Sequence, residues 1–285
     1  MLDEKWLAQL PLQDVQTAVA VGGGDVNDAY RLHADGQDCF LLVQPHMAAS
    51  FYDGEIAGLE AFAKADVLAP RVLGHGQIDG DAFLLLNYMT SGSGDQADLG
   101  RLIAHLHNFP SPDGRFGFDE PYAGTSVSFD NTWVDTWAEL FVGQRLDKLA
   151  AHLLKKRLWG EREHDTYLQA RDVITDELAR HHSQAVLLHG DLWRGNYMFT
   201  AEGKPALIDP AALYGDREFD IGVTTVFGGF DAEFYEAYQD ALPFDQGWQK
   251  RLNFYRLYYL MVHLDKFGES YYDAVSGLLQ RVISK

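Results

Sequence analysis

The fold of this chain is decided by the stretch His189-Gly190-Asp191-Leu192-Trp193-Arg194-Gly195-Asn196, together with Leu207-Ile208-Asp209 a little further on. The apolar run at 185–188 predicts a buried strand just before the first stretch. Residues 197–200 and 205–208 predict two short strands joined by a turn at Glu202-Gly203. A loop anchored by strands at both ends is a rigid platform for its polar side chains.

Three of these polar side chains have the spacing of a phosphoryl-transfer site. In such sites one Asp orients the attacking hydroxyl and accepts its proton, an Asn five residues later binds magnesium, and a further Asp bridges the metal to phosphate. Here these residues are Asp191, Asn196 and Asp209. A chance Asp/Asn-rich turn is the alternative, but the ordered series of strand, loop, Asn, hairpin and Asp favours the site.

The surrounding sequence resembles the fructosamine kinase (ketosamine 3-kinase) family, in the aminoglycoside-phosphotransferase-like branch of the protein-kinase-like fold. The resemblance is carried by HGDLWRGN at 189–196, IDPAALYGDREFDIG at 208–222 and FGGF at 227–230. It extends from the glycines near residue 22 to Phe267-Gly268. HGD with Asn and Asp is shared by many small-molecule kinases, whereas the longer block and FGGF are specific to a much narrower group.

This resemblance implies a two-lobed α+β, protein-kinase-like fold. Residues 1–90 would form an N-terminal lobe with the glycine loop and the nucleotide-binding sheet. Residues 91–285 would form a mostly helical lobe with the catalytic loop and the metal site. The implied reaction is ATP- and Mg²⁺-dependent phosphorylation of a ketoamine, of the fructosamine or ribulosamine type, at the sugar 3-hydroxyl.

The residue pattern agrees with a small lobe rich in strands. Strands are expected at 17–21, 29–34, 39–44 and 82–86, the second and third joined by a turn at Asp35-Gly36. Apolar residues at helical spacing predict a helix over 51–65. A polar, Gly-rich connector follows at 89–94, and Asp98 is expected to cap the next helix.

Two segments of this lobe are candidates for nucleotide binding. Gly22, Gly23 and Gly24 let backbone amides approach a phosphate where side chains would block it. A tight hairpin turn explains three glycines equally well. The second segment, Asn87-Tyr88-Met89, falls where a hinge should offer backbone groups to adenine, and an ordinary interlobe linker is compatible with that role.

The chain departs from the family at the third strand. Related kinases carry a lysine there that contacts the nucleotide phosphates and pairs with a glutamate, here Glu55. Leu42 stands at the expected position, and no lysine lies between Lys5 and Lys64. Arg31 on the neighbouring strand is a candidate substitute. A catalytically impaired pseudokinase therefore stays open beside the kinase, as does a kinase for another hydroxylated small molecule, such as an aminoglycoside or amino alcohol.

The resemblance places Trp193 and His263 near the acceptor sugar. Trp193 could stack on the apolar face of a ligand, or it could anchor the loop by packing. His263 lies in an apolar helical run, where a buried structural histidine is equally consistent. A polar network that braces the catalytic loop is expected from the following block, whose polar members are Asp216, Arg217, Glu218 and Asp220.

Composition is consistent with a cytoplasmic globular enzyme. The net charge of −19 repels phosphate backbones and anionic lipid, which argues against nucleic acid or a membrane as the main partner. Cys39 is the only cysteine, so the chain has no internal disulfide and no cysteine cluster for zinc. No apolar run approaches the roughly 20 residues of a membrane span. The oligomeric state is not indicated by the sequence.

Overall fold

The computed structural model describes residues 2–22, 27–121 and 127–284. Within these residues the chain forms two compact units. The first contains Met1–Gly94 and Met198–Asp209, and the second contains Asp95–Tyr197 and Pro210–Lys285. An antiparallel sheet in the first unit and a mostly helical second unit confirm the expected α+β class.

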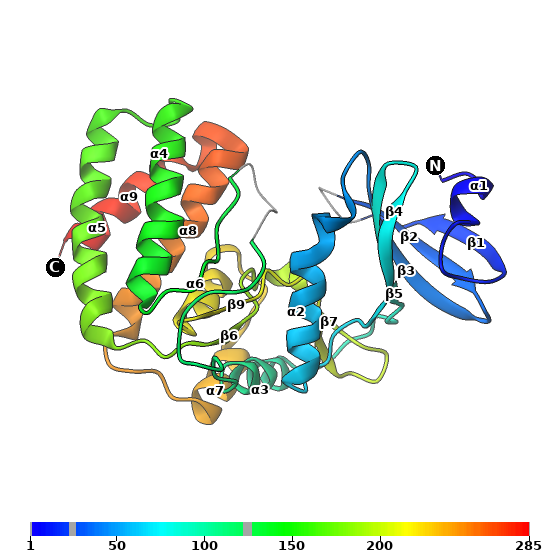
Figure 1. Ribbon diagram of the computed structural model, residues 1–285. Helices are drawn as coiled ribbons and strands as arrows, with labels where there is room; N and C mark the ends of the chain where they lie inside the picture. Colours follow the sequence, from blue (N-terminus) through cyan, green and yellow to red (C-terminus); the bar gives the residue numbers. More distant parts are fainter. Residues whose placement is uncertain (1, 23–26, 122–126, 285) are drawn as a thin grey trace. The chain divides into compact units, whose positions relative to one another are not determined.

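The first unit is built on a five-stranded antiparallel sheet with the order β1-β2-β3-β5-β4 (Figure 1). Its strands are β1 (Val15–Ala20), β2 (Asp28–Ala34), β3 (Gln37–Gln44), β4 (Val72–Ile78) and β5 (Asp81–Asn87). The β2–β3 hairpin turns at Asp35 and Gly36, both with positive φ, as the sequence predicts for this dipeptide.

Side chains alternate between the two faces of this sheet, and each face has its own apolar cluster. Trp6 of α1 (Glu4–Leu7) belongs to the cluster on one face, and Leu59 of α2 (Asp53–Lys64) belongs to the cluster on the other. Figure 1 shows these two helices on opposite sides of the sheet. The first cluster comprises Trp6, Leu10, Tyr30, Leu32, Cys39, Leu41, Val43, Ile78, Phe83 and Leu85. The second comprises Tyr52, Leu59, Ala82, Leu84 and Leu86.

One strand of the sheet, β4, was not expected from the sequence. Its residues VLGHGQI include two glycines and two polar side chains, which lower β-propensity. β4 lies at the edge of the sheet and pairs only with β5, and its side chains alternate between partly buried and exposed. An edge strand tolerates this composition because only one of its two edges pairs with a neighbouring strand.

The expected hairpin after the catalytic loop consists of β7 (Tyr197–Phe199) and β8 (Pro205–Leu207). Most of it packs with the first unit, although the sequence-based division places it in the second lobe. Backbone hydrogen bonds explain this grouping: Gly92 N–H donates to Phe199, and Leu207 N–H donates to the carbonyl oxygen of Leu68. Asp209 is therefore carried by the first unit.

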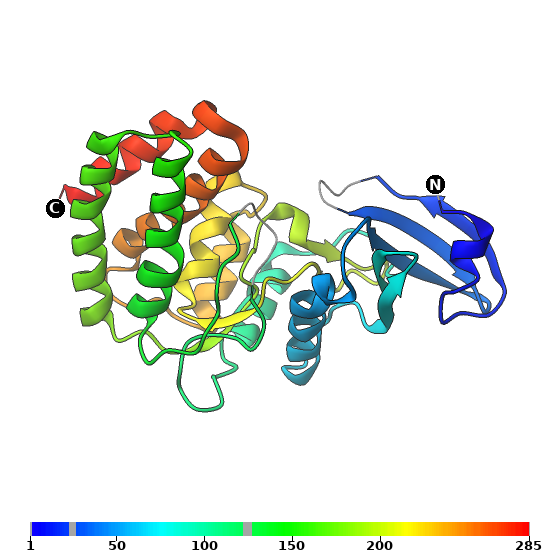
Figure 2. The same ribbon diagram turned by 45° about the horizontal axis from the view of Figure 1, so that its top comes forward.

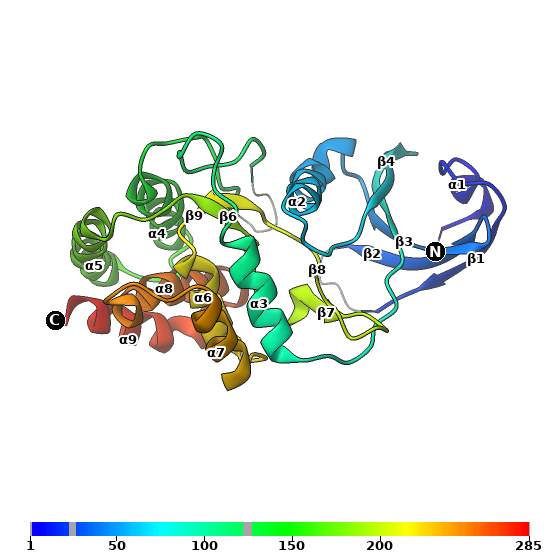
Figure 3. The same ribbon diagram turned by 90° about the horizontal axis from the view of Figure 1, so that it is seen from below.

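The second unit is mainly helical. Helices α4, α5, α8 and α9 pack together (Figure 2), and α3 lies along α7 (Figure 3). The helices are α3 (Gln96–Leu106), α4 (Asp147–Lys155), α5 (Glu161–His181), α6 (Glu218–Phe227), α7 (Ala232–Ala241), α8 (Trp248–Phe267) and α9 (Tyr272–Ile283). A π-helical segment, Glu139–Leu146, precedes α4, and a 3₁₀ turn, Gly268–Tyr271, joins α8 to α9.

The cap of α3 differs from the expectation. Asp95, not Asp98, is the N-cap, and its side chain accepts a hydrogen bond from Ala97 N–H. Asp98 lies in the first turn, where a carboxylate favours the helix dipole, and it pairs with Arg101. Among the residues described, no helix combines the length and the apolar character needed to cross a bilayer.

Candidate active site

The catalytic loop begins at the end of a fully buried strand. That strand, β6 (Val186–Leu188), pairs antiparallel with β9 (Leu213–Gly215). Gly190 then has a φ of +83°, and a Cβ at this position would lie 1.9 Å from the carbonyl oxygen of Ala211. Ala211 N–H donates to the carbonyl oxygen of His189 at 2.9 Å. Only glycine fits at this close crossing of two backbone segments, which explains its place in the His-Gly-Asp motif.

Asp191 and Asn196 are held side by side in the second unit. Asn196 is buried at the end of a short 3₁₀ turn, Arg194–Asn196. Its Nδ2 donates to the main-chain oxygen of Asp191 at 2.9 Å and to Oδ2 of the same residue at 3.2 Å. These bonds use the nitrogen of the amide, so Oδ1 is the atom of Asn196 that could ligate a metal ion. Amide and carboxylate oxygens are the hard ligands that Mg²⁺ prefers.

The first turn of α6 fixes the backbone of the catalytic loop. Asp220 is fully buried, and its two carboxylate oxygens accept hydrogen bonds from His189 N–H at 2.7 Å and Gly190 N–H at 2.9 Å. His107 Nε2 lies 3.2 Å from the same carboxylate. From α8, the Tyr259 hydroxyl donates to the carbonyl oxygen of Gly190 at 2.8 Å. The two residues that precede Asp191 are therefore held in place by groups from α6 and α8.

The rest of the expected polar network lies further from the loop. Asp216 is buried and accepts hydrogen bonds from His181 and Ser183. Burial opposes its ionisation, but these two hydrogen bonds outweigh that cost and lower the pKa of Asp216. Arg217 does not pair with the network carboxylates. It donates instead to the carbonyl oxygens of Leu242 and Pro243, at 3.0 and 2.6 Å.

The bidentate arginine of this network is Arg251 on α8, which the sequence did not single out. Its guanidinium donates to both carboxylate oxygens of Glu218, at 2.8 and 2.6 Å, and both side chains are buried. The sequence pattern also did not single out Tyr259 and His107. Each lies in an apolar helical run whose pattern reads as core, and only the packing of helices shows which partner it meets.

Glu55 and Asp209 form an acidic pair in the first unit. Burial, which is the larger cause, and the negative charge of Asp209 together raise the pKa of Glu55 to about 8. Asp209 adopts a left-handed backbone conformation, with φ of +53°. Glu55 makes no ion pair with any residue that the structure describes. A divalent cation bound at Asp209 would therefore relieve an existing electrostatic cost.

Leu42, which stands where the family resemblance predicts a lysine, makes an apolar contact. Leu42 on β3 lies opposite Leu84 on β5 and packs against the second apolar cluster of the sheet. Arg31 lies opposite Phe40, two residues from Leu42 along β3 and on the same face. Its guanidinium, however, is bound to Asp38, which lies two residues before Phe40 on β3 and on the same face. Arg31 is therefore already neutralised by another carboxylate.

The proposed hinge residues differ in what their backbone groups already bind. Asn87 N–H donates to the carbonyl oxygen of Arg71 at 3.0 Å, and Tyr88 N–H donates to that of Asp38 at 3.3 Å. Met89 N–H has no such partner among the described residues. Of the glycine loop, Gly22 is exposed, whereas Gly23 and Gly24 lie outside the described residues.

Both predicted acceptor residues belong to the second unit. Trp193 is 43% exposed in the catalytic loop. His263 is partly buried on α8, and its Nδ1 lies 2.9 Å from the carbonyl oxygen of Tyr259, one helical turn earlier. Burial lowers the pKa of His263. Because a carbonyl oxygen can only accept, Nδ1 carries the proton and Nε2 of the neutral ring is an acceptor.

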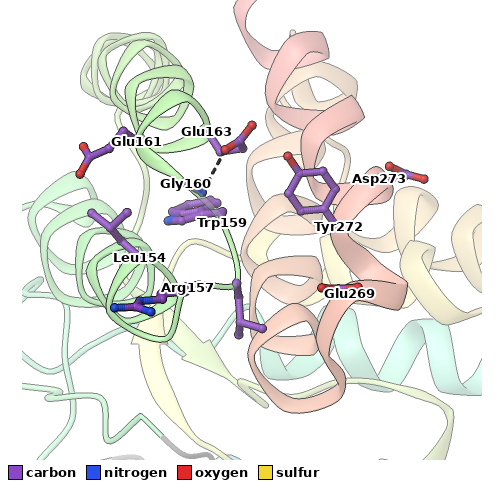
Figure 4. A pocket seen from close by; sticks show the side chains of 10 residues that line it. Leu154, Arg157, Trp159, Gly160, Glu161, Glu163, Glu269, Tyr272 and Asp273 are labelled. Carbon is purple, nitrogen blue, oxygen red and sulfur yellow. Dashed lines mark hydrogen bonds between the residues drawn. The ribbon is translucent and has the colours of Figure 1, made fainter.

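A pocket of about 780 Å³ lies elsewhere in the second unit, between the start of α5 and the start of α9 (Figure 4). Trp159 and Tyr272 line it together with acidic side chains such as Glu269. It contains none of the residues predicted for catalysis, metal binding or acceptor binding. We therefore do not assign this pocket to the candidate active site.

The fold and the motifs together define a kinase-like phosphotransferase: a five-stranded antiparallel sheet is followed by a mostly helical part that carries the His-Gly-Asp loop. A family model described as fructosamine kinase matches residues 3–285. The chain belongs to this family, whose members are phosphotransferases with an alcohol group as acceptor. Membership of a kinase family implies the use of ATP.

Individual relatives agree with this assignment. A protein of Staphylococcus aureus named probable ketoamine kinase is 51% identical over 283 residues, which cover 99% of this chain and 98% of that protein. A crystal structure from Haemophilus somnus, whose name provisionally assigns it to the fructosamine-3-kinases, has a TM-score of 0.85 and 25% identity, with coverage of 98% and 94%. A thermostable mutant of the aminoglycoside phosphotransferase APH(4)-Ia, in ternary complex with AMP-PNP and hygromycin B, shares the fold, with a TM-score of 0.64, 16% identity and coverage of 98% and 96%.

Proposed function

We propose that this chain transfers the γ-phosphoryl group of ATP to the 3-hydroxyl of the sugar of a ketoamine, of the fructosamine or ribulosamine type. The family assignment and the ketoamine kinase name of the Staphylococcus aureus relative support the acceptor class. The name of the Haemophilus somnus protein supports the 3-position. Mg²⁺ is the proposed metal.

The proposal depends most on the hydrogen-bonded pair of Asp191 and Asn196. The carboxylate is partly buried, its amide neighbour is buried, and Asp220 and Tyr259 fix the backbone of Gly190, the residue that precedes Asp191. Catalysis of phosphoryl transfer relies on positioning and charge neutralisation more than on covalent chemistry. A rigid carboxylate beside a metal-binding amide meets both needs.

In this mechanism Asp191 accepts a hydrogen bond from the sugar 3-hydroxyl and directs its oxygen toward the γ-phosphorus. As the new oxygen–phosphorus bond forms, the bond between the γ-phosphorus and the bridging oxygen of the β-phosphate breaks. The hydroxyl proton passes to Asp191, and ADP leaves with the electron pair of the broken bond. The products are the sugar 3-phosphate and ADP, so atoms and charge balance.

The residues present suit Mg²⁺ and a nucleotide. Asn196 Oδ1 and the Asp209 carboxylate are hard oxygen ligands, and we propose that they hold the metal. Mg²⁺ supplies charge neutralisation at the triphosphate when it is bound. The raised pKa of Glu55 supports a cation near Asp209, because positive charge there would offset the repulsion between the two carboxylates. Met89 N–H is the proposed donor to adenine.

The decisive experiment incubates the protein with ATP, Mg²⁺ and a fructosamine or ribulosamine, and locates the phosphate on the product by ³¹P and ¹³C NMR. Asp191→Ala should abolish turnover, while ATP with Mg²⁺ still raises the melting temperature. Asp98→Ala, at an exposed carboxylate on α3 of the same unit, serves as the matched control and should remain active. Turnover by Asp191→Ala would refute its assignment as the base.

Leu42 favours a second candidate function, that of a nucleotide-binding pseudokinase. An apolar side chain at this position can neither contact phosphate nor neutralise Glu55. A thermal-shift titration with ATP and Mg²⁺, followed by an assay for ADP release, separates the two functions. Binding without ADP release across ketoamines, aminoglycosides and amino alcohols supports the pseudokinase. Release with an aminoglycoside or amino alcohol alone identifies a kinase for a different acceptor.

A further inference from the structure

Four aromatic rings form a surface next to the catalytic loop, where α6 and α8 run side by side (Figure 1). The His263 ring centre lies 4.3 Å from that of Phe227, 5.3 Å from that of Phe267 and 5.1 Å from that of Tyr271. We call these four residues the aromatic shelf. Phe227 is 39% exposed and Phe267 is 49% exposed, so the shelf presents apolar ring surface to solvent.

This exposure is concentrated in one part of the second unit. Among its described residues, the exposed large apolar side chains are Leu168, Trp193, Phe227 and Phe267. Leu168 lies on α5, and the three aromatic residues lie in the catalytic loop or on the shelf. Burying a Phe side chain stabilises a protein by about 1.5–3 kcal/mol relative to leaving it exposed. Neighbouring apolar side chains left exposed in this way mark binding surfaces.

Two sets of contacts hold the shelf against the catalytic loop. On α8, Tyr259 binds the carbonyl oxygen of Gly190, and His263 follows one turn later, about 5.4 Å along the axis. After α6, Gly229 follows Phe227 closely, and its carbonyl oxygen accepts a hydrogen bond from Tyr197 OH at 2.6 Å. The shelf is therefore positioned relative to the residue that precedes Asp191.

The Gly229 backbone also touches the loop itself. A Cβ at Gly229 would lie 2.5 Å from Cβ of Arg194, so the segment after α6 is pressed directly onto the catalytic loop. The Arg194 guanidinium in turn lies over the Tyr197 ring, 4.8 Å from its centre. An acceptor whose hydroxyl reaches Asp191 would have the remainder of its length next to these rings.

The chemistry of the shelf suits a protonated amine with an apolar substituent. Aromatic faces attract cations, and Lys266 already places its ammonium group 5.1 Å from the centre of the Phe267 ring. Nε2 of His263 is a hydrogen-bond acceptor because Nδ1 donates to Tyr259. A ketoamine carries a secondary amine that is protonated at neutral pH, and its N–H groups are donors.

We propose that the aromatic shelf binds the amine end of the ketoamine and selects substrates whose nitrogen carries an apolar or aromatic group. Phe227 and Phe267 are the specificity-determining residues, and His263 accepts a hydrogen bond from the substrate. This inference rests on the proposed ketoamine kinase function. It specifies which amines the active site prefers and which aromatic residues determine that preference.

The test compares two ketoamines that differ only in the amine, one made from methylamine and one from benzylamine. The wild-type protein should have the lower KM for the benzylamine derivative. Phe227→Ala and Phe267→Ala should each raise that KM about tenfold, the size expected for one aromatic contact, with kcat unchanged. The KM for the methylamine derivative and for ATP should stay within about twofold, a change too small to indicate a lost contact.

Two further variants separate binding from structure. Phe227→Tyr keeps the ring and should restore the wild-type KM, whereas Leu168→Ala removes an exposed apolar side chain on α5 and should have no effect. Calorimetric titration of the benzylamine derivative without nucleotide should show the same loss of affinity as the KM values. An equal loss for both ketoamines, a loss confined to kcat, or no change in either variant overturns the role of the shelf. If the wild-type protein phosphorylates neither ketoamine, the proposed function itself has failed, and the variants are not needed to show it.

Discussion

Replacement of Glu55 by Gln tests the electrostatics of the nucleotide side of the site. Glu55 lies on α2. In related kinases a lysine on the third strand pairs with the corresponding glutamate, whereas in this chain Leu42 stands on that strand. Burial, followed by the charge of Asp209, raises the pKa of Glu55 from 4.5 to about 8. A raised pKa in the folded state means that Glu55 favours folding below about pH 4.5, and that this contribution is lost as the pH rises toward 8.

The magnitude follows from proton linkage. With a pKa of about 8 in the folded state and 4.5 in the unfolded state, stability falls by about 3 kcal/mol between pH 5 and pH 8. Partial solvent access to the side chain reduces this to about 2 kcal/mol. Glutamine has a similar shape and cannot ionise, so Glu55→Gln removes this pH dependence. The variant should match the wild type at pH 5 and be about 2 kcal/mol more stable at pH 8.

The assay is urea unfolding of both proteins at pH 5, 6, 7 and 8, in EDTA so that no divalent cation binds near Asp209. Glu60→Gln, at an exposed carboxylate on the same helix, is the matched control and should follow the wild type at every pH. Saturating Mg²⁺ and ATP should shrink the difference between Glu55→Gln and the wild type. An advantage of Glu55→Gln that is the same at pH 5 and pH 8, or that Glu60→Gln shares, would show that the pKa of Glu55 is not raised.

Two other substitutions probe the missing cation and the buried ion pair. Leu42→Lys should strengthen ATP binding or raise turnover, because the ammonium can contact phosphate and neutralise Glu55. A calorimetric titration with ATP and a rate assay measure the two effects. No gain in either would argue that the absent cation does not limit the activity of the protein. Arg251→Met should lower the free energy of unfolding by about 3–5 kcal/mol, because it leaves the Glu218 carboxylate buried without its partner. The combined variant Arg251→Met with Glu218→Leu should regain most of that loss in the same denaturation assay, and a double variant as unstable as the single one would refute this account.

Much of the fold can be predicted from the sequence because its signals are local. Alternating side chains and the Asp35-Gly36 turn determine the β2–β3 hairpin within a few residues, and the packed sheet follows the same alternation. The exception is β4, whose glycines and polar residues give no strand signal. That segment becomes a strand because β5 offers it an unpaired edge, which is information carried by another part of the chain.

The sequence by itself determined that Asp191 and Asn196 of the candidate site meet, since they are five residues apart and one short turn brings them together. Only the tertiary structure decided what supports that core. Asp220 and Tyr259 reach Gly190 across 30 and 69 residues of chain. Hydrophobic periodicity shows which face of a helix is buried, but not which partner a polar atom meets there. The packing of helices makes that choice, because a buried hydrogen bond forms only where two elements bring donor and acceptor within about 3 Å.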